Sequence, residues 1–285
     1  MNVYDTTKEM LSSYENNQFD LSKWEEYMDS FVPGAKKFCL KDMHECFESG
    51  YSWEKDFVPV LNAVVGDPDI CNEIVTSFHR VANNLEEKII KRFGKSIDAD
   101  IFLYLGLCNG AGWVTEINGR TTILLGVEKI LELHWQDIDF MNALIIHELG
   151  HVYHTQYGIS HRNIEFRTNQ DQFLWQLFRE GVAMVFEHEI LDDPEYYHQD
   201  NSGWKDWCDD HFEYIRESFS KDMEVMNRDN QRYFGDWVDF EGYSDVGYYL
   251  GTRFIQYLLR LDSFDNIIRY NIETVREKYK GFCSV

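Results

Sequence analysis

Apolar residues recur at helical spacing along most of the chain and change to strand-like runs over one central stretch. Before residue 95 this spacing predicts short helices throughout. They cover residues 4–19, 21–31, 36–47, 53–65 and 69–93. We therefore expect an all-helical N-terminal region over residues 1–95.

The pattern changes after Gly94, where β-forming residues dominate residues 99–106, 113–117 and 120–125. Asn118-Gly119 separates the last two runs, and an Asn-Gly pair between β-prone runs is a strong hairpin signal. A small sheet is thus expected before the next helix.

Two interpretations stay open for Gly110-Ala111-Gly112-Trp113, which lies between the first two expected strands. One is a plain glycine turn. The other is an active-site edge, where these four residues let an extended substrate peptide pair with the strand.

Helical spacing returns after the sheet and continues to the end of the chain. The expected helices cover residues 169–191, 205–226, 247–261 and 264–279. The chain has no internal repeat or low-complexity tract. The pattern predicts an α+β fold that is mostly helical, with two regions, residues 1–95 and residues 96–285.

The main candidate for chemistry is His147-Glu148-Leu-Gly-His151, inside a run that predicts a helix capped by Asp137 or Asp139. On a helix, His147 and His151 lie one turn apart on the same side, where two imidazoles can bind one ion. Glu148 lies beside them and can reach a water at that ion. The ligand side overlaps the apolar stripe, and burying these groups without a metal would be costly.

Two histidines leave a catalytic zinc site one protein ligand short. A third histidine soon after His151 is one solution, but His154 and Tyr157 occupy the relevant positions. A carboxylate from a later helix is the other, and Glu180 is an acid on an otherwise apolar helix face. Weaker candidates for the third ligand are Glu187, Glu189, Glu165 and His161.

Composition limits the partners and the compartment. The 285 residues carry a formal net charge of −23, which argues against nucleic acid and anionic membranes as partners. The N-terminus does not resemble a signal peptide, and no apolar run approaches the length of a membrane span. The six cysteines are scattered, without a Cys-x-x-Cys pair. We expect a cytoplasmic protein without a disulfide framework; its oligomeric state does not follow from the sequence.

Two of these motifs together resemble those of a known class of enzymes. His147-Glu-Leu-Gly-His151 followed by Glu180-Gly-Val-Ala183 resembles the gluzincin class of zinc peptidases. In that class, two histidines of one helix and a glutamate of a following helix bind zinc. The order of elements from about residue 97 to 262 is most similar to little-characterised bacterial families of predicted zinc-dependent proteases.

The zinc aminopeptidase branch of this class also has a tyrosine in a Tyr-x-x-Gly motif, where it stabilises the tetrahedral intermediate. Tyr248-Tyr-Leu-Gly251 is similar to that motif. Two features depart from the branch: Arg179 replaces the usual asparagine before the glutamate, and Gly110-Ala-Gly-Trp-Val114 lacks the acid of the exopeptidase motif. These departures favour an endopeptidase or oligopeptidase over an aminopeptidase.

The resemblance implies a zincin core of the thermolysin and aminopeptidase kind in residues 96–285. It implies one zinc ion per chain, held by His147, His151 and Glu180, with Glu148 as general base and Tyr248 at the oxyanion. The expected partner is a peptide or protein substrate.

Two alternatives remain. Metallopeptidases that cleave phage-type repressors also have His-Glu-Leu-Gly-His and then a glutamate with Ala, Phe and Pro downstream, as in Glu180, Ala183, Phe186 and Pro194. The second alternative is a metal-binding interaction module that turns over little substrate.

Overall fold

The computed structural model describes residues 1–159, 164–200 and 203–284. By its contacts the chain divides into two compact units, Met1–Glu148 and Leu149–Val285. The division falls inside helix α8 (Ile138–Tyr157), which contributes one part to each unit. No boundary between units falls near residue 95, since the N-terminal helices and the sheet both belong to the first unit.

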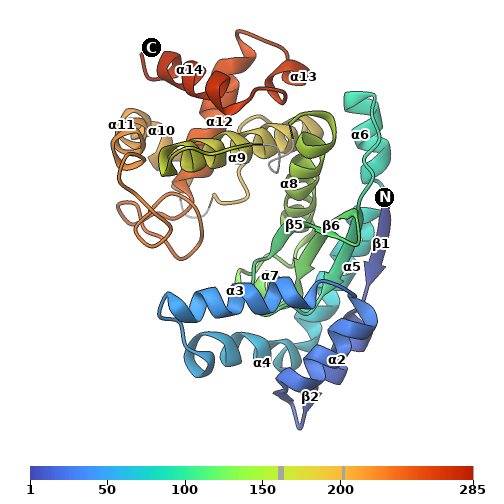
Figure 1. Ribbon diagram of the computed structural model, residues 1–285. Coiled ribbons are helices and arrows are strands. Elements are labelled where there is room, and N and C mark those ends of the chain that lie inside the picture. The colour runs from blue at the N-terminus through green and yellow to red at the C-terminus, as the bar shows by residue number, and fades with distance from the viewer. Residues whose placement is uncertain (160–163, 201–202, 285) are drawn as a thin grey trace. The chain divides into compact units, whose positions relative to one another are not determined.

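The first unit contains a four-stranded mixed sheet in the order β1-β4-β6-β5 (Figure 1). The strands β1 and β6 run parallel to β4 on its two sides, and β5 pairs antiparallel with β6 at one edge. Strands β4 and β6 are mostly buried, as is typical of strands covered on both faces. The strands are β1 (Asn2–Asp5), β4 (Asp100–Tyr104), β5 (Gly112–Ile117) and β6 (Arg120–Gly126).

The prediction of helices from the very start of the chain is wrong. β1 is a strand of the main sheet, and a short helix and a 3-10 turn follow it, α1 (Thr7–Met10) and η1 (Leu11–Ser13). A small hairpin then pairs β2 (Tyr14–Glu15) with β3 (Gln18–Phe19). The partner of β1 is β4, far along the chain, so local periodicity carries little information about this pairing.

The hairpin predicted from Asn118-Gly119 is confirmed. β5 and β6 pair in register around it, with Ile117 opposite Arg120. Asn118 and Gly119 have φ angles of 53° and 80°. A two-residue type I′ turn requires positive φ at both central positions, which Asn and Gly tolerate best.

Later helices of the first unit follow the predicted segments, with two changes. The segment 53–65 begins as a π-helical turn, and the segment 69–93 is interrupted at Asn83-Asn84. Asparagine side chains compete with helical hydrogen bonds, which favours a break there. The elements are α2 (Leu21–Phe31), α3 (Lys36–Glu48), η2 (Trp53–Phe57), α4 (Val58–Gly66), α5 (Pro68–Ala82), α6 (Leu85–Phe93) and α7 (Val127–Glu132).

The second unit is built around helix α9 (Asn169–Leu191), which is buried along most of its length and has the predicted bounds. Helices α12 (Val246–Leu259) and α14 (Ile272–Phe282) pack on it (Figure 1). The predicted segments 205–226 and 264–279 are each divided in two. The additional helices are α10 (Trp204–Asp210), α11 (Phe212–Asp222) and α13 (Phe264–Ile267).

Small residues bring three helices into close contact. A Cβ atom on Gly181 of α9 would lie 2.2 Å from the main-chain oxygen of Gly251 of α12. A Cβ atom on Gly150 of α8 would lie 2.9 Å from Cα of Ala183 of α9. Real Cβ atoms do not approach other atoms this closely, so only glycine permits both contacts. Small residues of three sequence motifs therefore set the spacing of α8, α9 and α12.

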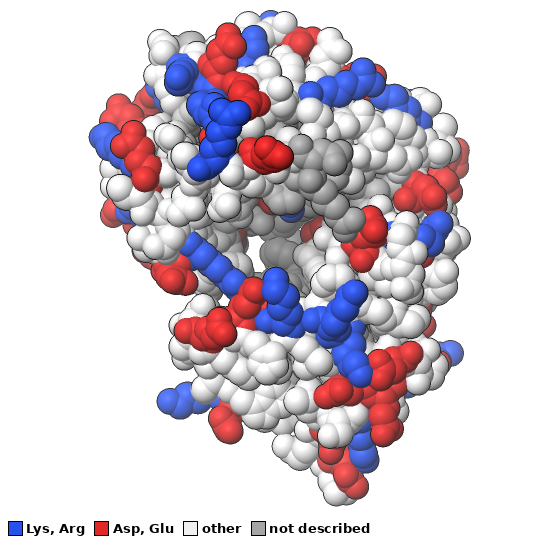
Figure 2. Space-filling view, viewed as in Figure 1, with Lys and Arg blue, Asp and Glu red and all other residues white. Residues whose placement is uncertain are grey.

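The fold is thus α+β and mostly helical, as expected. All six cysteines are thiols, which agrees with the absence of a disulfide framework. On the face drawn in Figure 2, basic side chains lie in small groups next to acidic ones. In the described ranges, none of the helices has the length and apolar character that a membrane crossing requires.

Candidate metal centre

Helix α8 begins where the sequence predicts. The Asp137 side chain accepts hydrogen bonds from the main-chain nitrogens of Asp139 and Phe140, at 2.8 and 3.0 Å. Asp137 is therefore the cap. Every residue of α8 from 143 to 154 is buried, so the helix is enclosed on all sides there. His147 and His151 lie one turn apart in this enclosed part, 4 % and 7 % exposed.

Glu180 comes from the middle of α9, where its apolar neighbours Leu177 and Met184 are fully buried. Its Oε2 lies 3.0 Å from Nε2 of His151. Its Oε1 lies 3.5 Å from the Arg179 guanidinium. The residue that departs from the aminopeptidase pattern thus contacts the Glu180 carboxylate.

His147, His151 and Glu180 form a buried group that could hold a metal ion. Each offers one ligand atom, and these atoms all lie within 4.8 Å of one another. Around a tetrahedral ion bound at 2.0–2.2 Å, neighbouring ligand atoms are about 3.4 Å apart. The 3.0 Å contact of His151 with Glu180 is close to that value. Two imidazoles and a carboxylate are suitable ligands for a divalent transition metal.

The side chain of Glu148, in helix α8, lies next to Gly112, the first residue of strand β5. A Cβ atom on Gly112 would lie 2.9 Å from Oε1 and from Cγ of Glu148. Glu148 is 6 % exposed, so its carboxylate occupies the space that a side chain at position 112 would need. Glycine at this position therefore allows the strand backbone to approach the acid.

The four residues expected to contact a substrate differ in burial, hydrogen bonding and backbone conformation. Ala111 is nearly buried, and its carbonyl accepts a hydrogen bond from the Gly126 nitrogen at 3.0 Å. Trp113 donates from Nε1 to the Tyr104 hydroxyl at 3.1 Å. Its ring is therefore directed away from Glu148, because successive side chains of a strand point to opposite faces. Gly110 has φ +154° and precedes the strand.

Tyr248 lies in the first turn of α12, three residues before Gly251. Its ring is half-buried and packs edge-on against Phe234, with the centroids 6.0 Å apart. Since Gly251 touches Gly181, Tyr248 and Glu180 are carried by two helices in direct contact. The glycine of the Tyr-x-x-Gly motif thus has a packing role, in addition to any chemical role of the tyrosine.

The weaker ligand candidates that the structure describes lie outside the group. Glu187 is fully buried, and its Oε1 lies 3.2 Å from Nδ1 of His198, a partner that no sequence pattern indicated. Glu189 is half-buried and Glu165 is exposed. His161 falls outside the described residues.

His154 follows His151 by about one turn but has a different environment. Its ring packs against Trp175 and Phe178, with centroids 5.7 and 5.6 Å away. Burial, with a smaller contribution from His151, lowers the pKa of His154 to about 3. It is therefore a neutral core residue at physiological pH.

Sequence reasoning missed Glu128, a buried acid in the first turn of α7. Its two carboxylate oxygens accept hydrogen bonds from the main-chain nitrogens of Gly106 and Cys108, at 2.9 and 3.1 Å. These bonds order the loop that leads into β5. Burial raises the pKa of Glu128 to about 7. From the sequence, an acid at the start of a helix indicates only a favourable interaction with the helix dipole.

Glu128 should make stability depend on pH. Its folded pKa is raised above the unfolded value, so the folded state binds the proton more tightly. Its contribution to the unfolding free energy therefore falls as pH rises from about 4.5 to about 7, by about 3 kcal/mol in total. Glu128→Gln should lack this fall. Urea unfolding of both proteins at about pH 5 and about pH 8 measures the difference; the same pH dependence in both would contradict the assignment.

No protein-family model, curated protein or solved structure matches this chain. Any functional conclusion therefore rests on the site itself.

Proposed function

We propose that the protein is a zinc-dependent peptidase of the gluzincin kind. The observation that carries the proposal is the buried group of His147, His151 and Glu180, with Glu148 in the same helix as the two histidines. Catalytic zinc sites use three protein ligands and leave one position for water, whereas structural sites fill all four positions. Within the described residues the group has three members, and with its adjacent acid it is better suited to catalysis than to a structural role.

In this proposal each side chain has a separate role. His147, His151 and Glu180 hold the ion, which when bound acts as a Lewis acid and lowers the pKa of water towards neutrality. Glu148 takes a proton from the attacking water and passes it to the leaving amine. The Tyr248 hydroxyl donates a hydrogen bond to the developing oxyanion.

Strand β5 supports a peptide as the substrate. It is the edge strand next to β6, and it begins at Gly112, beside Glu148. An extended peptide that pairs with this edge would bring a carbonyl group close to the acid. The main chain of residues 110–113 would supply the hydrogen bonds, since the Trp113 ring points elsewhere. The missing exopeptidase acid favours an endopeptidase or oligopeptidase.

The proposal includes a zincin-like core. The small sheet, α8 with its two histidines, α9 with its glutamate and α12 with its tyrosine follow one another in the order that the gluzincin class has. Gly150, Gly181 and Gly251 support the same proposal, because they let the ligand-bearing and tyrosine-bearing helices approach each other closely.

Removing Glu180 should remove the metal. We expect about one zinc per chain in the wild type and a marked loss in Glu180→Ala, because a three-ligand site is reduced to two histidines. Elemental analysis of protein purified in chelator-free buffer measures both. Glu165→Ala is the matched control, since Glu165 is an exposed acid outside the group, and it should keep its zinc.

The outcomes separate the possibilities. Full zinc in Glu180→Ala would move the third ligand elsewhere, with Glu187 and Glu189 to be tested next. No metal in the wild type would overturn the proposal. Stoichiometric zinc without cleavage of any member of a diverse peptide library would favour the interaction module over the peptidase.

A further inference from the structure

A second site lies in the unit Leu149–Val285, on the surface formed by α11, α12 and the end of α14. A cavity of about 200 Å³ is lined there by three arginines, Arg216, Arg253 and Arg260, and by aromatic rings that include Phe212 and Phe282. None of these residues belongs to the metal centre. We call this feature the arginine cavity.

Arg216 is fixed in the wall of the arginine cavity. It is 9 % exposed, and its guanidinium lies 5.3 Å from the Phe212 ring and 5.5 Å from the Phe282 ring. It donates to the main-chain oxygen of Phe282 at 2.7 Å and also contacts Glu213. The two rings, the carbonyl and the one acid together fix the direction of the Arg216 guanidinium.

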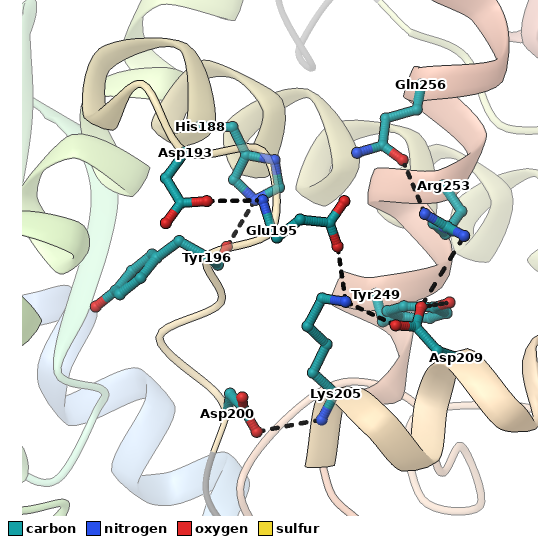
Figure 3. A network of polar contacts seen from close by, with 10 residues as sticks. All are labelled: His188, Asp193, Glu195, Tyr196, Asp200, Lys205, Asp209, Tyr249, Arg253 and Gln256. Atoms are coloured by element: carbon teal, nitrogen blue, oxygen red, sulfur yellow. Dashed lines mark hydrogen bonds and ion pairs between the residues drawn. The ribbon is translucent and has the colours of Figure 1, made fainter. Parts of the chain in front are cut away.

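Arg253 is held in a similar way. Figure 3 shows its guanidinium between Gln256 and Asp209. The nearest approach to Asp209 is 4.0 Å, which is long for an ion pair, while the Phe212 and Tyr249 rings lie 5.8 and 5.5 Å away. The main contacts of this guanidinium are thus rings and an amide, and its charge is only partly neutralised.

Arg260 directly follows the last residue of α12 and is exposed. Within the described part of the chain, no ion pair of its side chain with an acid is found. It is the arginine that a ligand could reach with least rearrangement, and its removal should disturb the fold least.

The charge of this cavity differs from that of the whole chain. Its lining has three arginines and one acid, Glu213, an excess of two positive charges, in a protein whose formal net charge is −23. Keeping three guanidinium groups together with few acids costs repulsion unless an anion joins them. Rigid guanidinium groups are also the side chains best suited to bind phosphate or carboxylate through paired hydrogen bonds.

We propose that the arginine cavity binds a small, doubly charged oxyanion: a phosphate, either free or as the phosphate group of a small monoester. A phosphate presents three strong acceptor oxygens and about two negative charges, which suits a cavity lined by three guanidinium groups with an excess of two positive charges. A cavity of about 200 Å³ is below the range of about 300–1,000 Å³ for drug-sized ligands. The ligand is therefore small.

Titration calorimetry with inorganic phosphate at low salt tests the proposal. The wild type should bind, and Arg260→Ala should bind on the order of ten- to a hundredfold more weakly, as expected for losing hydrogen bonds to a charged group. Arg80→Ala is the matched control, because Arg80 is also exposed and, among the described contacts, has no ion pair. It should bind like the wild type.

Two further measurements make the result decisive. Phosphate should raise the melting temperature of the wild type and of Arg80→Ala, but less that of Arg260→Ala, because a ligand of the folded state stabilises it by mass action. Phenyl phosphate distinguishes a monoester from the free ion: tighter binding than phosphate would assign the ester, and weaker binding the free ion.

Several results would overturn the proposal. Equal phosphate affinity in the wild type and in Arg260→Ala would place the ion elsewhere, for example at the metal centre. The absence of binding by the wild type at millimolar phosphate would exclude the site. Binding of succinate but not of phosphate would assign a dicarboxylate in place of the phosphate.

Discussion

Replacing Glu148 by glutamine should reduce kcat/KM for peptide hydrolysis by about 10²–10⁴-fold, the usual contribution of a general acid–base group. Glutamine has nearly the same shape, so it occupies the space beside Gly112 without new contacts. It cannot accept the proton of the attacking water. The three proposed metal ligands are untouched, so the variant should keep the zinc content of the wild type.

The measurement is kcat/KM on the best peptide from a library, together with elemental analysis of the same samples. Glu132→Gln is the matched control, because Glu132 is an exposed glutamate on α7 that pairs with Lys129; it should be fully active. Undiminished activity of Glu148→Gln would remove Glu148 from the mechanism. Loss of zinc from that variant would instead make Glu148 a ligand.

Gly181→Ala should strongly destabilise the second unit. The added Cβ would lie 2.2 Å from the carbonyl oxygen of Gly251, and two main chains cannot rotate away as a side chain can. The helices α9 and α12 must then separate. We expect a loss of about 3 kcal/mol of unfolding free energy, the upper part of the usual range for overpacking. Glu180 is the preceding residue, so zinc affinity should fall as well.

Thermal and urea unfolding with and without zinc measure both effects. Gly66→Ala is the control for the general effect of replacing a helical glycine. A Cβ at Gly66 meets nothing within 4 Å, so this change should be neutral or slightly stabilising. Equal stability of Gly181→Ala and Gly66→Ala would show that the helix contact is not as close as described.

The sequence is informative where the determinants are local. The bounds of α2 and α9, the cap at Asp137 and the hairpin at Asn118-Gly119 all depend on residues within a few positions of one another. The relative placement of His147 and His151 is also a local property, because one helical turn separates them. Glu180 was predicted as the third ligand because it is one acid on an otherwise apolar helix face. The structure places it next to His151.

Features that depend on distant partners were missed. β1 gives no local sign of the strand it pairs with. Glu128 binds main-chain nitrogens across a loop, which leaves no pattern in side-chain types. The arginine cavity joins residues of three helices that are adjacent only after folding. In each case the determining contact is non-local, so periodicity and spacing do not predict it.

The contact between Gly181 and Gly251 also limits which sequences this fold can accept. At most core positions, an enlarged residue can be compensated when its neighbour becomes smaller. Here both partners already lack a side chain, so neither can be reduced further. A selection for second-site suppressors of Gly181→Ala should therefore return the original glycine, or changes elsewhere that displace a whole helix, and no compensating substitution at position 251.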